Sequence, residues 1–130
     1  MANAWKPSGF TSVAPYLITR NAQQLIDFLG ATLSATPLRR FDKPDGSIAH
    51  AEVRIDDTVV MMGEVGEESA AVPCHLHVYV EDADRTYQAA LANGATSVQA
   101  PTRREGDSDR RGGVTDPGGN TWWFSTQIED

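Results

Sequence analysis

The chain has 130 residues, of which 40% are hydrophobic and 22% charged, and its formal net charge is −7. This length suits a single domain over 1–130, and an acidic chain lacks the basic stripe that binds a nucleic-acid backbone. Because no apolar run reaches the ~20 residues of a membrane span and the first ten residues lack a secretory signal's apolar core, we expect a cytoplasmic protein with no membrane or nucleic-acid partner.

The first predicted strand covers 13–19, and a helix follows it. Asn21 can cap this helix, and its apolar residues recur with a period of 3.6: Ala22, Leu25, Ile26, Leu29 and Leu33. Three further strands are expected at about 36–42, 48–55 and 58–63. A linker rich in Glu, Gly, Ala and Ser occupies 64–73.

The second half of the chain repeats this order. A strand over 75–80 precedes a helix that Asp82 can cap and Asn93-Gly94 can end. Strand candidates follow at about 96–100, 111–115 and 120–126. The two caps lie 61 residues apart, and the last strands of the two halves lie 62 apart. A constant offset indicates an internal duplication, with module one at about 11–64 and module two at about 74–127.

Cys74, at the start of module two, is the only cysteine. A single thiol excludes an intrachain disulfide and a metal cluster built from cysteines. Because Leu76 and Val78 follow it closely, we expect Cys74 to be a buried or half-buried hydrophobe.

Each βαβββ unit predicts a curved sheet whose helix covers one face and leaves the concave face open. Two such faces, opposed, enclose a cleft lined by alternate residues of each strand. The alternation assigns these residues to the cleft: Tyr16, His50, Glu52, Arg54, Met61, His75, His77 and Tyr79. It divides the last strand into Trp122 with Phe124, and Trp123 with Thr121 and Ser125.

These features resemble the vicinal oxygen chelate superfamily (glyoxalase, bleomycin-resistance protein, extradiol dioxygenase) over about 11–127. The resemblance rests on 15–28, on 75–82 and, most specifically, on the hairpin sequence at 116–123. It implies an α+β fold of two tandem βαβββ modules forming an open curved sheet. Members are usually dimers with sites between modules, sometimes drawn from different subunits.

Many members of the superfamily hold a divalent metal with one side chain from each of strands 1, 4, 5 and 8. The resemblance places these positions on Ala14, Met61, His75 and Trp123. Only His75 can ligate a metal, so we expect no metal and no other cofactor. An alternative is a different metal or acid–base cluster built from His50, Glu52, His75 and His77. A further alternative is that these groups are a passive lining of the cleft.

The sequence therefore predicts a homodimeric protein that binds a small apolar or aromatic molecule without the usual metal. The expected ligand contacts are Tyr16, His50, Met61, Tyr79, Trp123 and Arg111, and the candidate catalytic residues are His75, His77 and Glu52. Trp123 either contacts the ligand or belongs to the core.

Two other functions stay open. One is a metal-dependent lyase, isomerase or dioxygenase with a rearranged site, and the other is a structural or regulatory domain without a ligand. The segment 103–113 is either a lid over the cleft or a disordered hairpin, where Arg110 and Arg111 could meet an anionic group.

Overall fold

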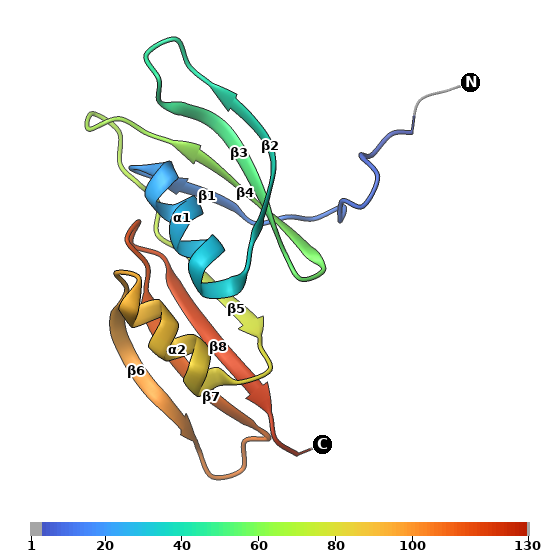
Figure 1. Ribbon diagram of the computed structural model, residues 1–130, viewed down its shortest axis with the longest axis vertical. Helices are drawn as coiled ribbons and strands as arrows, with labels where there is room; N and C mark the ends of the chain where they lie inside the picture. The colour runs from blue at the N-terminus through green and yellow to red at the C-terminus, as the bar shows by residue number, and fades with distance from the viewer. Residues whose placement is uncertain (1–3, 130) are drawn as a thin grey trace.

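Two four-stranded sheets, each with one helix, make up the computed structural model, which describes residues 4–129. Module one contains β1 (Tyr16–Thr19), α1 (Ala22–Leu33), β2 (Thr36–Asp42), β3 (Ile48–Ile55) and β4 (Thr58–Glu64). Module two contains β5 (His75–Tyr79), α2 (Ala83–Ala92), β6 (Thr96–Arg103), β7 (Asp109–Thr115) and β8 (Thr121–Gln127). The predicted α+β fold of two tandem βαβββ modules is confirmed (Figure 1).

The two sheets repeat one strand order, β1-β4-β3-β2 and β5-β8-β7-β6. In each, the first strand runs parallel to the last, so that Tyr16 lies opposite Met61 and His77 lies opposite Trp123. Tyr16 and His77 therefore occupy equivalent positions in the duplication. The first strand is shorter than predicted and begins at Tyr16, since Val13 lies outside it and is 84% exposed.

Both helices begin at the predicted caps. The side chains of Asn21 and Asp82 accept hydrogen bonds from backbone N–H groups one turn into their helices. The last strand of each module supplies a further acceptor: Glu64 for the N–H of Ala22, and Thr126 for the N–H of Ala83. Each helix is therefore tied by its first turn to the sheet on which it packs.

One continuous cluster of buried apolar side chains extends through both modules. Its members include Leu25, Phe28 and Leu29 of α1, Tyr87 of α2, and Val53, Trp122 and Phe124 of the sheets. Helix α1 contacts α2, and Figure 1 shows both helices in front of their sheets, with the modules stacked along the long axis. The apolar faces of the two modules thus meet on the helical side.

The concave face of each sheet stays open to solvent. Tyr16 and Phe41 of module one are 49% and 56% exposed, and Tyr79 of module two is 63% exposed. His75 and His77 are exposed as well. The single chain therefore does not enclose the predicted cleft, because its modules meet through their helices. A cavity of about 740 Å³ lies between the modules beside α1 and α2, and Tyr79 is the one predicted contact residue in its lining.

The hairpin between β7 and β8 is organised by the buried carboxylate of Asp116. One of its oxygens accepts from the backbone N–H groups of Gly118 and Asn120, at 2.7 and 3.0 Å. The other accepts from the indole N–H of Trp122, at 2.7 Å. This satisfies the one polar atom of a buried ring and holds Trp122 on the helix side of the sheet.

The segment 103–113 is an ordered part of the hairpin of β6 and β7, so the prediction of a disordered hairpin is wrong, and the lid over the cleft stays a prediction. Its second half belongs to β7, which pairs with β6 and β8, and only 104–108 joins the strands. In the sequence, Gly112 and Gly113 favour a loop. In the structure, they lie where neighbouring side chains leave no room for a Cβ atom. A Cβ atom would come within 2.9 Å of Pro101 at the first position and 2.5 Å of the Trp123 ring at the second.

Candidate functional site

The predicted polar residues gather into two separate clusters, one on the concave face of each sheet. The first-module cluster contains Tyr16, Arg39, His50 and Glu52. In it, the Tyr16 hydroxyl lies 3.1 Å from His50 Nδ1, and His50 Nε2 lies 2.9 Å from Glu52 Oε2. Two Arg39 nitrogens donate to the two Glu52 oxygens, each at 2.8 Å. The four side chains thus form one continuous chain of hydrogen bonds.

Glu52 is fully buried on this face, with 0% of its side chain exposed. The Arg39 guanidinium, assisted by the hydrogen bond from His50, lowers the pKa of the Glu52 carboxyl to about 2. Burial has the opposite effect on this pKa but is outweighed. The carboxylate is therefore ionised at neutral pH and accepts hydrogen bonds on both oxygens. A group held so far below neutral pH is a weak base, so the geometry favours Glu52 as the residue that orients His50.

Sequence reasoning missed Arg39. The pairing of β2 with β3 shifts register between Pro37 and Arg40, and such an irregularity breaks the alternation that assigns residues to faces. No signal in the sequence marks this shift. Arg54, assigned to the same face, donates instead to the backbone carbonyl of Gly9 at 2.8 Å.

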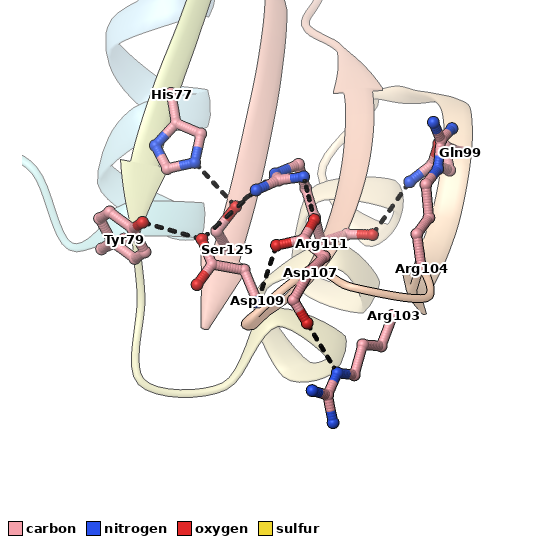
Figure 2. Close-up of polar contacts among 9 residues, drawn as sticks. All are labelled: His77, Tyr79, Gln99, Arg103, Arg104, Asp107, Asp109, Arg111 and Ser125. Atoms are coloured by element: carbon pink, nitrogen blue, oxygen red, sulfur yellow. Dashed lines mark hydrogen bonds and ion pairs between the residues drawn. The ribbon is translucent and has the colours of Figure 1, made fainter. Parts of the chain in front are cut away.

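The second-module cluster, shown in Figure 2, surrounds the guanidinium of Arg111. It comprises His77, Tyr79, Asp107, Asp109, Arg111 and Ser125. Arg111 donates to Ser125 Oγ at 2.8 Å, to Asp107 at 3.0 Å and to Asp109 at 3.3 Å. His77 Nε2 lies 2.8 Å from Ser125 Oγ. Every member is therefore bonded to another, which fixes the whole face.

The positive charge in this cluster is fully paired. Arg111 is paired with two carboxylates, and the neighbouring Arg110 turns to the other side of its strand and binds Asp84 at 2.6 and 2.8 Å. The Tyr79 hydroxyl donates to Asp109 at 2.8 Å, and this bond raises the pKa of Tyr79. An anionic ligand group would have to displace a carboxylate from Arg111, so this face disfavours the anion contact considered from the sequence.

Trp123 lies on the concave face, half-buried, whereas its neighbour Trp122 is 1% exposed in the core. The Trp123 indole N–H donates to His75 Nδ1 at 3.0 Å, and the two rings are stacked with 12° between their planes. A cavity of about 230 Å³ lies against this ring and is lined also by Gln99, Thr102, Arg104, Asp107 and Arg111. Trp123 is therefore not a fully buried core residue.

The four superfamily ligand positions do not fit a metal. Ala14, Met61 and Trp123 offer no suitable donor. Because an indole N–H can only donate, the Nδ1 atom of His75 must accept from Trp123, which leaves the proton on Nε2. The alternative cluster of His50, Glu52, His75 and His77 is divided between the two sheets. Within residues 4–129, no three His, Cys, Asp or Glu side chains could together hold a metal ion.

Cys74 is half-buried, as expected, and contacts the side-chain oxygen of Asn120. Burial, together with the nearby charge of Asp116, raises the pKa of its thiol. A raised pKa lowers the fraction of reactive thiolate.

No helix in the described part of the chain is long and apolar enough to cross a membrane.

The chain is similar in sequence to known proteins. The family that matches residues 9–124 is described as the Glyoxalase/Bleomycin resistance protein/Dioxygenase superfamily. An uncharacterized protein of Mycobacterium bovis is 34% identical, and the match covers 92% of this chain and 85% of that protein.

Two solved structures are similar in fold. TioX from Micromonospora sp. ML1 has a TM-score of 0.75 at 23% identity, over 90% of this chain and 98% of that chain. The fosfomycin resistance protein FosX from Mesorhizobium loti has a TM-score of 0.63 at 17% identity, over 89% of this chain and 91% of that chain. At such identities the likeness concerns the fold alone.

The Glu52 carboxylate generates a prediction about stability and pH. Its folded pKa of about 2 lies below the ordinary 4.5, so its stabilising effect is complete above about pH 4.5 and fades as the pH falls towards 2. We expect Glu52→Gln to lower the free energy of unfolding by about 1–3 kcal/mol near pH 7, and by progressively less in acid.

Urea denaturation at a series of pH values measures this difference. Glu68→Gln, at an exposed position, is the matched control and should leave the pH dependence unchanged. A Glu52→Gln effect of the same size at pH 7 and pH 3 would contradict the argument.

Proposed function

Since the chain belongs to the glyoxalase/bleomycin resistance protein/dioxygenase superfamily, we propose that it is a small-molecule binding protein that holds an apolar or aromatic compound on its concave faces. Because this fold serves many chemistries, the proposal rests on the site. The observation that carries it is the position of Trp123, whose ring lies on the open face of the sheet beside a cavity.

The composition of this face supports an aromatic ligand. His75 stacks on Trp123, and His77 meets Tyr79 edge to face with ring centroids 4.8 Å apart. Aromatic surfaces with a few fixed polar groups are typical of small-molecule sites. The polar atoms here are already bonded to each other, so they would orient a ligand with little loss of side-chain freedom.

The proposed state of the protein in solution is a homodimer. Each concave face presents exposed aromatic residues, among them Tyr16, Phe41 and Tyr79, and each sheet has open edges. Two-fold association is the commonest way to cover such surfaces. A second copy could place the module-one face of one chain over the module-two face of the other, which would complete a cleft that one chain leaves open.

The dimer is tested by light scattering. We expect a mass of twice 14.1 kDa at micromolar concentration, because a standard interface of about 1,200–2,000 Å² supports association in that range. A mass of one chain throughout this range would contradict the dimer, and each half-site would then have to bind its ligand alone.

The ligand site is tested by replacing Trp123. In calorimetric titration with an aromatic probe such as 2-naphthol, Trp123→Ala should weaken binding roughly 5–150-fold, which corresponds to about 1–3 kcal/mol for a half-buried aromatic anchor. Trp122→Ala is the matched comparison, because removal of that fully buried ring should lower the free energy of unfolding by about 3–5 kcal/mol.

Two results would count against this site. One is unchanged affinity in Trp123→Ala. The other is a loss of stability as large as that of Trp122→Ala, which would make Trp123 a core residue.

Independence from metal is a separate expectation. Because the residues at the superfamily ligand positions do not fit a metal, EDTA should leave the thermal midpoint unchanged, and one equivalent of zinc or nickel should not raise it. A bound metal would stabilise the native state by mass action. A rise of several degrees that His75→Ala abolishes would overturn this expectation and favour a metal-dependent lyase, isomerase or dioxygenase.

A further inference from the structure

In the first-module cluster, each hydrogen bond has a defined donor and a defined acceptor. This direction implies a ligand preference beyond the aromatic class proposed above. We propose that Tyr16 presents its hydroxyl oxygen as an acceptor only, and that it selects aromatic ligands that carry a hydroxyl group. The inference rests on the proposed function for the aromatic class of the ligand. The direction of the hydrogen bonds follows from the protein alone.

The direction starts at Glu52. Its carboxylate is ionised and has no hydrogen to donate, and Arg39 occupies both oxygens from one side. His50 Nε2 lies 2.9 Å from one of these oxygens. Since two lone pairs at this distance would repel each other, Nε2 must carry the imidazole hydrogen and donate it to Glu52.

The second step concerns the other ring nitrogen. In neutral His50, a hydrogen on Nε2 leaves a lone pair on Nδ1. The Tyr16 hydroxyl, 3.1 Å away, therefore donates its only hydrogen to Nδ1. The oxygen of Tyr16 keeps its lone pairs and has nothing left to donate to a ligand.

The duplication shows why this oxygen stays available. In module two, His77 occupies the position of Tyr16, and its ring bonds to Ser125 on the last strand at 2.8 Å. The residue of module one equivalent to Ser125 is Gly63, where an added Cβ would lie 3.0 Å from the Tyr16 hydroxyl oxygen. Without a side chain at Gly63, no second hydrogen bond to this oxygen forms among residues 4–129.

The surroundings of Tyr16 suit a flat apolar ring. Tyr16 and Phe41 lie on either side of His50, with ring centroids 5.5 and 6.2 Å from the imidazole, and both are about half exposed. Met61 lies directly opposite Tyr16 on the neighbouring strand. An aromatic ring could rest on this surface while its hydroxyl group donates to Tyr16.

The direction of the hydrogen bonds can be measured without a ligand. Two-bond ¹H–¹⁵N correlation spectra distinguish the two imidazole tautomers, and the His50 signal is identified by its loss in His50→Gln. At about pH 8, where an ordinary imidazole is neutral, we expect the hydrogen of His50 on Nε2. A hydrogen on Nδ1 would overturn the inference.

Selection is tested with a matched pair of probes, 2-naphthol and its methyl ether 2-methoxynaphthalene. The wild-type protein should bind the naphthol roughly 3–10-fold more tightly, the difference expected for one net hydrogen bond. Tyr16→Phe should remove this preference and leave the affinity for the ether unchanged. Tyr87→Phe is the matched control and should keep the preference, because Tyr87 is buried on α2, away from the concave faces, with its hydroxyl 2.5 Å from Ser97 Oγ.

Each remaining outcome overturns the inference in a distinguishable way. Equal binding of both probes by the wild-type protein contradicts the selection and leaves the aromatic site intact. Equal weakening of both in Tyr16→Phe would give Tyr16 a packing role. If neither probe binds, the inference and the proposed function fail together.

Discussion

Each helix of this protein covers only one face of a four-stranded sheet, and the organisation of the molecule depends on that constraint. Every strand has to present an apolar row to the helix and a second row to the opposite side. A slip of one residue would exchange the two rows. The adjacent rings of Trp122 and Trp123 show the consequence: the first is fixed in the core by its bond to Asp116, and the second is left on the open face.

The charged residues on the two open faces are paired with each other. In a cleft filled with water, such complete pairing would not be required. Glu52 is buried beneath Arg39, and Arg111 is enclosed by Asp107 and Asp109. Burial of a charge is tolerated only when the charge is bonded, so each face has closed its polar groups into a cluster. The two modules reached this state with different side chains at equivalent positions. The duplication therefore preserved the geometry and changed the chemistry.

Much of the fold could be predicted from local signals. The helix caps and the alternation along β3 depend on neighbouring residues, and the predicted range of that strand agrees with the observed Ile48–Ile55. The candidate site was harder to predict from the sequence. Arg39 follows a register shift in β2, and β7 resembles a loop because its glycines make room for distant side chains. The helix-to-helix packing that leaves the concave faces open depends on contacts between modules, which no short pattern specifies.

Gly113 shows how far such a distant contact reaches. The Trp123 ring lies over the backbone of this residue so closely that not even a methyl group fits between them. The position therefore sets how far the indole stands out from its sheet, although a bound molecule would touch the ring and not the glycine. In a duplicated scaffold of this kind, related proteins could acquire narrower or wider sites through a residue that never meets the ligand.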